Sequence, residues 1–233
     1  IGDLMYAIMN KAFSSSPKLY WGPLFQEMVN QTSQKHIFFY VYDKSAQTGL
    51  EALNASGKIL PFEGDYLHIN EANFGGAKSN LFTTEDVTQN YKKESDGTIT
   101  KTITINYKNP FSPSDCNLER GKLCLNAVLR NWIRIYVPKG SKMLDSQGSE
   151  VKMITYDELG KTVFEGFLTV RPKGIAKFTI SYTLPFKLAN NSPLPALYQK
   201  QGGTPGFDYT VLVNGSKKEK FQLLTDKTLK LDL

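Results

Sequence analysis

The chain has 233 residues, 40% hydrophobic and 12% aromatic, a composition that indicates a folded globular protein and excludes a disordered one. No apolar run approaches the roughly 20 residues that a membrane-spanning helix requires. The net charge of +6 is uneven, because residues 1–80 hold 6 Lys and 7 Asp or Glu, so the remainder carries the whole basic excess. The basic residues are dispersed rather than clustered, so we expect a solvated lysine-rich surface and no nucleic-acid partner.

Helical spacing of apolar residues dominates the first part of the chain. It predicts three helices, over residues 1–13, 17–31 and about 45–54. The first break falls at Ser14-Ser15-Ser16-Pro17, and Asp43 or Ser45 is expected to cap the third helix. Two strands are predicted in the same part, over 36–42 and 58–61.

The run from Gly64 to Asn80 is the most informative part of the chain. A short alternating apolar stretch leads into Asn73, two glycines, Lys78 and Ser79. The spacing excludes a nucleotide-binding phosphate loop, because the first glycine is missing and a strand pattern follows. We expect a turn between a helical and a β part, in which glycine supplies a positive φ and Asn73 or Asn80 bonds the backbone. The alternative is a weak anion- or glycan-binding site on Asn73, Lys78 and Ser79.

From about residue 81 the apolar residues alternate with a period of two, which predicts strands. The expected strands are 81–91, 98–107, 129–137, 161–170, 176–184, 196–201, 209–213 and 220–224. Hairpins are expected at Asp96-Gly97, at Asn214-Gly215 and across 171–174. The sequence therefore predicts an α+β fold: a helix-bearing part over 1–80, then an antiparallel β-sandwich over 81–233, immunoglobulin-like or jelly-roll-like.

The two cysteines, Cys116 and Cys124, flank a short segment that contains Gly121. Zinc needs about four ligands, and neither His36 nor His68 lies near them in the sequence. We therefore predict a local disulfide and no metal site, with two free thiols as the alternative. A disulfide implies an oxidising, extracytoplasmic setting.

No pattern in the sequence is specific for catalysis. Asp65, Glu71, Glu85 and Asp86 could pair for acid–base chemistry on a glycan, but their density is ordinary for any chain. No calcium-loop motif and no Gly-x-Ser-x-Gly motif is present. We therefore predict no catalytic residues and no cofactor.

The aromatic residues are expected mostly in the core, with Trp21 as an alternative platform for stacking on a sugar. They include Tyr20, Trp21, Tyr40, Tyr42, Trp132 and Tyr136. Asn-x-Ser/Thr sequences begin at Asn30, Asn54, Asn190 and Asn214, and would matter only in a secreted eukaryotic protein.

Several segments, in order along nearly the whole chain, resemble a bacterial family known as domain of unknown function 4012. They are His36–Tyr40, Asp65–Leu67, Asn73–Asn80, Trp132–Ser141 and Tyr198–Pro205. The resemblance implies a membrane-anchored cell-surface protein, of which this chain, beginning at Ile1, would be the C-terminal extracytoplasmic portion. The family's more N-terminal region is similar to cell-envelope phosphotransferases. That region is not part of this chain, so the resemblance supplies no catalytic residue.

These observations predict a non-catalytic extracytoplasmic module that binds or organises cell-envelope components. Its expected partner is an anionic cell-wall polymer or glycan, and membrane contact is expected only through an anchor outside this chain. The alternative is an accessory half of a polymer-transferring, phosphotransferase-like enzyme whose catalytic part lies upstream.

Overall fold

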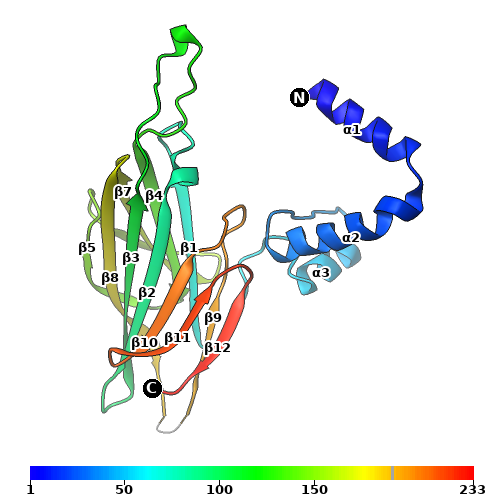
Figure 1. The fold of residues 1–233 in the computed structure, drawn as a ribbon. Helices are drawn as coiled ribbons and strands as arrows, with labels where there is room; N and C mark the ends of the chain where they lie inside the picture. The colour runs from blue at the N-terminus through cyan, green and yellow to red at the C-terminus, as the bar shows by residue number, and fades with distance from the viewer. Residues whose placement is uncertain (190–191) are drawn as a thin grey trace. The chain divides into compact units, whose positions relative to one another are not determined.

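The chain forms two compact units, Ile1–Lys58 and Ile59–Leu233, in a computed structural model that describes residues 1–189 and 192–233. Asn190, which begins one of the Asn-x-Ser sequences, lies outside the described residues. Helices precede the strands, as expected for a mixed α/β chain (Figure 1). The units meet between Lys58 and Ile59 rather than near the predicted residue 80, because Asp65–Asn73 is a full strand of the β unit.

The first unit contains the three predicted helices, α1 (Gly2–Ser14), α2 (Pro17–Ser33) and α3 (Lys44–Ala52). Asp43 caps α3, since its Oδ1 accepts a hydrogen bond of 2.8 Å from the Ala46 backbone N–H. None of the side chains in these three helices is buried.

Two expectations for the first unit and its junction are wrong. Residues 36–42 and 58–61 are not strands, because neither segment finds a ladder partner. Trp21, Tyr40 and Tyr42 are not core residues, since their side chains are 58%, 73% and 94% exposed.

The second unit consists of two six-stranded sheets that share one core. We call β12-β9-β1-β4-β7-β6 the first sheet and β11-β10-β2-β3-β8-β5 the second sheet. The strands are β1 (Asp65–Asn73), β2 (Thr84–Lys93), β3 (Thr98–Asn109), β4 (Leu129–Pro138), β5 (Lys142–Gln147), β6 (Ile154–Glu158), β7 (Lys161–Val170), β8 (Gly174–Lys187), β9 (Leu194–Tyr198), β10 (Asp208–Val213), β11 (Ser216–Gln222) and β12 (Lys227–Leu231).

Two of the three predicted hairpins are confirmed. β2 pairs with β3 across Asp96-Gly97, and β10 pairs with β11 across Asn214-Gly215, whose φ values of 51° and 77° suit a tight hairpin turn. The hairpin predicted across 171–174 does not form, because β7 lies in the first sheet and β8 in the second. Alternation identifies the inward face of each strand but not its neighbour, so it could not separate a hairpin from a crossing between sheets.

The sequence predicts a purely antiparallel sandwich, and this prediction is wrong. β9 runs parallel to β1 in the first sheet, and β10 runs parallel to β2 in the second. The C-terminal strands thus extend both sheets (Figure 1). In the first sheet β9 lies beside β1 and β12 beside β9, and in the second sheet β10 lies beside β2 and β11 beside β10.

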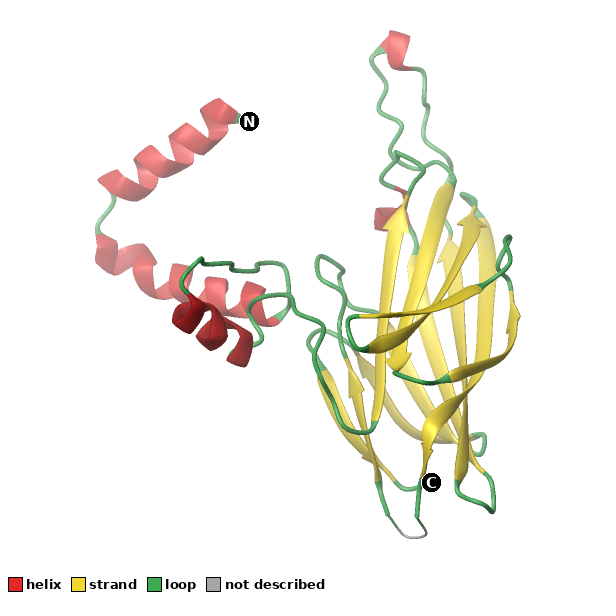
Figure 2. Ribbon diagram, turned by 180° about the vertical axis from the view of Figure 1, so that it is seen from behind, coloured by secondary structure: helices red, strands yellow, loops and turns green. Residues whose placement is uncertain are grey.

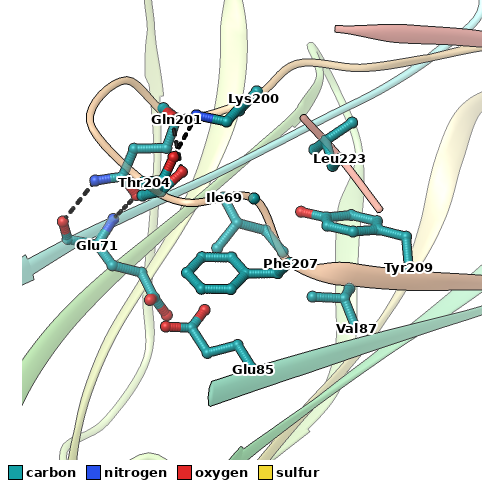
Figure 3. Close-up of a pocket in the computed structure, with 11 residues that line it drawn as sticks. Ile69, Glu71, Glu85, Val87, Lys200, Gln201, Thr204, Phe207, Tyr209 and Leu223 are labelled. Atoms are coloured by element: carbon teal, nitrogen blue, oxygen red, sulfur yellow. Dashed lines mark hydrogen bonds between the residues drawn. The ribbon is translucent and has the colours of Figure 1, made fainter. Parts of the chain in front are cut away.

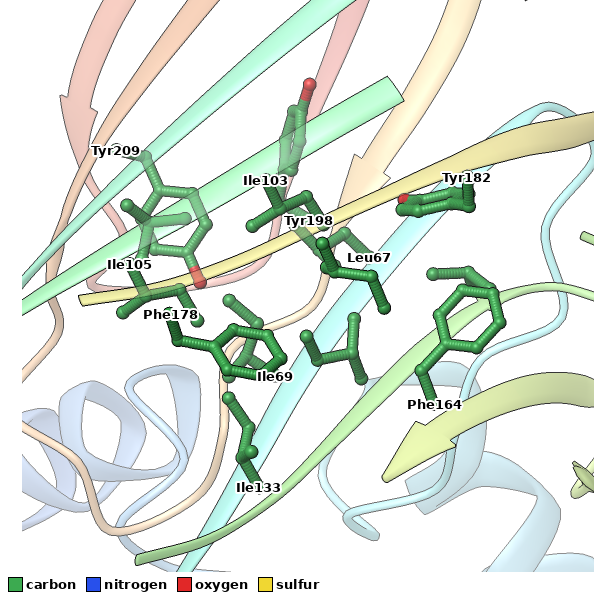
Figure 4. Close-up of a cluster of buried hydrophobic side chains, with 14 of the residues drawn as sticks. Leu67, Ile69, Ile103, Ile105, Ile133, Phe164, Phe178, Tyr182, Tyr198 and Tyr209 are labelled. Carbon is green, nitrogen blue, oxygen red and sulfur yellow. The ribbon is translucent and has the colours of Figure 1, made fainter. Parts of the chain in front are cut away.

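Inward side chains of both sheets fill the core (Figure 4). Leu67 and Ile133 come from the first sheet, and Ile103 and Phe178 from the second, and all are at most 1% exposed. Each such side chain contributes about 1.5–3 kcal/mol through removal of apolar surface from water.

A short segment, Ile59–Phe62, crosses the outer face of the first sheet, and we call it the strap. Its side chains pack against a second apolar cluster made of Tyr66, Tyr136, Val163 and Leu197. The Leu60 backbone N–H also donates to Gln199 Oε1 at 3.0 Å. The strap therefore belongs to the β unit.

The loop between β3 and β4, residues 110–128, forms an arm that extends beyond the ends of the strands (Figure 2). The predicted disulfide between Cys116 and Cys124 is confirmed and lies in this arm. Asn109 and Asn126, both buried, hydrogen-bond at its base at 2.7 Å. Within the described residues, no helix is long and apolar enough to cross a membrane.

Candidate functional site

The predicted glycine turn follows directly on β1, which ends at Asn73. There Asn73 Oδ1 accepts a hydrogen bond from the Gly75 backbone N–H at 2.7 Å, and its Nδ2 donates to the Ala77 carbonyl at 2.8 Å. Gly76 has a φ of +76°, as a turn of this kind requires. The expectation that Asn73 bonds the backbone of a glycine turn is therefore confirmed.

The three residues of the weak anion site do not converge on one point. Asn73 is engaged with its own loop. Ser79 is fully buried and its Oγ donates to the Ala127 carbonyl at 2.8 Å. Of the three residues, only Lys78 is exposed. An anion site here would therefore consist of Lys78 and of other residues that were not predicted from the sequence.

Those residues lie beside the turn, on the outer face of the first sheet. The Phe74 ring stacks on Trp132 of β4, with centroids 5.5 Å apart and an interplanar angle of 21°. The Arg134 guanidinium carbon lies 4.5 Å from the Trp132 centroid. Phe74 is 64% exposed. Trp132, predicted mostly for the core, therefore lies on the outer face instead, because the inward positions of β4 are held by its neighbours Asn131 and Ile133.

Three basic side chains, those of Lys78, Arg130 and Arg134, lie near the two rings. Arg130 is exposed, and its carbonyl accepts a hydrogen bond from the Phe74 N–H at 2.8 Å, which holds the two residues side by side. Arg134 is fixed by a 2.8 Å hydrogen bond from Nη2 to Asn70 Oδ1. Arg130 and Lys78 form no ion pair with any described residue. We call Phe74, Lys78, Arg130, Trp132 and Arg134 the aromatic–cationic patch.

Inside the sandwich, the structure brings together two of the four carboxylates considered from sequence. Glu71 of β1 and Glu85 of β2 point toward one another from opposite sheets (Figure 3). Asp65 lies elsewhere in the core, and Asp86 is exposed on the outer side of β2. The cavity beside Glu71 and Glu85 has a volume of about 10 Å³, room for about one water molecule and none for a sugar ring.

The environment of this carboxyl pair disfavours two negative charges. Tyr107 donates a hydrogen bond to Glu71 Oε1. Burial, and then the charge of Glu71, raise the pKa of Glu85 well above its ordinary value. Burial also raises the pKa of Glu71, against the opposing effect of the Tyr107 hydrogen bond. The pair is therefore best described as two carboxyl groups that share a proton.

A second polar cluster crosses the core. Lys101 Nζ of β3 lies 2.6 Å from Asp65 Oδ2 of β1, and both side chains are completely buried. The Tyr91 hydroxyl donates to the same Oδ2 at 2.5 Å and lies 2.9 Å from the Tyr198 hydroxyl. Lys101 is not among the site residues predicted from the sequence, although the alternation of β3 places it at an inward position between Ile99 and Ile103.

No protein-family model and no curated protein matches the chain. A solved structure from Legionella pneumophila, described as a "putative nutrient binding protein", is similar at a TM-score of 0.40 and 7% identity, over 66% of this chain and 56% of that one. An M1 zinc metallopeptidase from Deinococcus radiodurans is similar at a TM-score of 0.28 and 11% identity, over 56% of this chain and 31% of that one. This chain thus spans less than two thirds of either structure. Likenesses this distant assign no function.

Proposed function

We propose that the chain is an extracytoplasmic binding module, non-catalytic by itself, whose aromatic–cationic patch takes an anionic cell-wall polymer or glycan. The observation that carries this proposal is the exposed Phe74 ring stacked on Trp132, with Arg130 and Lys78 beside it. A rigid aromatic surface offers apolar contact area that suits the flat face of a sugar ring. Basic side chains attract the phosphate or carboxylate groups of such a polymer.

The proposed location is the cell surface, with an anchor outside this chain. The disulfide in the arm supports an oxidising compartment. The resemblance to the 4012 family supports the same location, and membership of that family is part of the proposal.

Sedimentation of the purified protein with insoluble cell walls tests the proposal, using walls that carry their anionic polymer and walls stripped of it. We expect binding to the first and weak binding to the second. Phe74→Ala should weaken binding about tenfold, or about 1.4 kcal/mol. Arg130→Gln should weaken binding and reduce its salt dependence.

Phe111→Ala is the matched control, because Phe111 is also an exposed aromatic residue but lies in the arm. It should bind like the unaltered protein. If Phe74→Ala, Arg130→Gln and the unaltered protein bind equally well, the aromatic–cationic patch is not the binding site.

A second candidate function is an accessory half of a polymer-transferring enzyme. It is favoured by the first unit, whose helices bury no side chain and expose Leu4, Phe13 and Phe25 at 63%, 76% and 62%. Apolar surface of this extent is typical of a part that packs against another body. Polymer transfer by the full-length protein, with a raised KM for polymer after Phe74→Ala, would support this candidate.

A further inference from the structure

The buried Asp65–Lys101 pair has an unusual chemical setting. Its carboxylate and amine come from opposite sheets and meet at 2.6 Å with no exposure to solvent. Tyr91 and Tyr198 flank the amine, with Lys101 Nζ 4.8 Å and 5.5 Å from the centroids of their rings. Both tyrosines, and Tyr182 nearby, are also fully buried. Water is therefore excluded from the contact between the two groups.

An ion pair is poorly stabilised at this place. Two buried charges repay their desolvation only when all their hydrogen-bonding capacity is satisfied. Asp65 Oδ1, however, has no hydrogen-bond partner among the described residues. Transfer of one proton from Lys101 to Asp65 removes both charges. It leaves a neutral amine against a carboxylic acid.

Burial favours the uncharged amine, since desolvation lowers the pKa of Lys101, against the opposing charge of Asp65. A desolvated, deprotonated lysine is a nucleophile. Its nitrogen touches Oδ2 and is therefore one bond away from Asp65 Cγ, the electrophilic carbon.

We propose that Lys101 and Asp65 join in the folded protein through an amide bond between Lys101 Nζ and Asp65 Cγ. The nitrogen lone pair forms the C–N bond, and the π electrons of the carboxyl group move to Oδ2. The electron pair on Oδ2 then re-forms the carbonyl as the bond from Cγ to Oδ1 breaks. Oδ1 leaves as water and carries two protons, the one that Lys101 had given to the carboxyl group and one more from Nζ. No oxidant, reductant or other reactant is needed.

The surrounding groups fit this step. The Tyr91 hydroxyl, 2.5 Å from Oδ2, donates to the oxygen that carries negative charge in the tetrahedral intermediate. Holding the two reactants in place supplies an effective concentration of about 10⁵–10⁸ M, as in well-oriented intramolecular reactions. The product replaces a buried amine and a buried carboxylic acid with one amide, and the released water goes to solvent. The bond would join the two sheets covalently through β1 and β3.

Intact mass of the unaltered protein, measured under reducing conditions, tests the inference directly. We expect a mass below the sequence mass by one water molecule. Trypsin should not cleave after an acylated Lys101, so digestion should yield residues 59–78 linked to residues 94–108. A mass equal to that of the sequence, with cleavage after Lys101, would overturn the inference.

Variants locate the bond. Lys101→Arg keeps a long basic side chain but offers no free amine, so this variant should show the full sequence mass. Lys161→Arg is the matched control, because Lys161 is also buried and lies over an aromatic ring, 4.0 Å from the centroid of Tyr66, but has no carboxylate partner among the residues that the structure describes. It should keep the mass deficit. Tyr91→Phe should leave more chains unlinked soon after synthesis, since bond formation should slow about a hundredfold.

Discussion

At the scale of single residues, the buried polar groups determine how the β unit responds to pH. Glu85 is 8% exposed and faces Glu71, and Tyr107 interacts with both carboxyl groups. The other polar residues that line the cavity are Lys200, Gln201, Thr204 and Tyr209. Because the pKa of Glu85 is raised on folding from an ordinary value of 4.5, the folded protein binds more protons than the unfolded chain above that pH. The contribution of Glu85 to stability is therefore complete below about pH 4.5 and is lost as the pH rises through its folded-state pKa.

Glu85→Gln should remove most of this loss. We expect the free energy of unfolding of the variant to exceed that of the unaltered protein at pH 8 and to approach it at pH 4. Each unit by which folding raises the pKa corresponds to about 1.4 kcal/mol. Denaturant unfolding at the two pH values measures the difference. Asp86→Asn, at the neighbouring exposed position, is the control; an equal effect from it would argue against the buried pair.

These residues show the limit of sequence reasoning about the site. The alternation of β2 and β3 places Glu85 and Lys101 on inward positions, so their burial could be predicted. Their partners could not, because Glu71 and Asp65 belong to the other sheet and no local spacing relates the two sheets. The stack of Phe74 on Trp132 could not be predicted for a different reason: it depends on the register of β1 on β4, two neighbours in one sheet that are far apart in the chain.

At the scale of elements, the sequence predicts correctly those features that depend on only a few neighbouring residues. The Asp43 cap, the Asp96-Gly97 turn and the Asn214-Gly215 turn act within a few residues, and all three are confirmed. The strand predicted over 36–42 fails because a strand also needs a neighbour, which apolar composition does not supply. The parallel pairing of β9 with β1 joins residues far apart in the chain, beyond the reach of any turn signal.

The arm allows a prediction at this scale. Loop closure by Cys116–Cys124 is worth at most about 2–3 kcal/mol, and the arm is also held at its base by Asn109 and Asn126. Reduction should therefore accelerate tryptic cleavage after Arg120 and Lys122, both exposed, and lower the melting temperature of the β unit only slightly. Limited proteolysis and calorimetry, with and without reductant, measure the two effects. A large fall in melting temperature would mean that the arm unfolds together with the sandwich.

At the scale of the whole molecule, the chain consists of a helical unit with no buried helical side chain and a β unit with a large core. The strap determines where the β unit begins. Ile59, Leu60 and Phe62 cover the apolar cluster around Tyr66 and Tyr136 on the outer face of the first sheet. Strands alone therefore do not define the unit.

We expect residues 59–233 to fold without the helical unit. Residues 64–233, which lack the strap, should be less stable, because the apolar cluster around Tyr66 and Tyr136 would face water. The comparison of the two chains by thermal unfolding measures this contribution. Equal melting temperatures would show that the strap adds no stability, and a failure of 59–233 to fold would show that the β unit depends on the helices.

The position of β9 and β10 has a consequence for the order of events during synthesis. Until residues 194–213 have left the ribosome, β1 and β2 have no partner on one side, and each is an open edge that can pair with another chain. Two strands made late, β9 and β10, therefore pair with the first two strands made, β1 and β2. A nascent chain that stalls before residue 194 presents two such edges at once, and the emergence of residues 194–213 closes both of them.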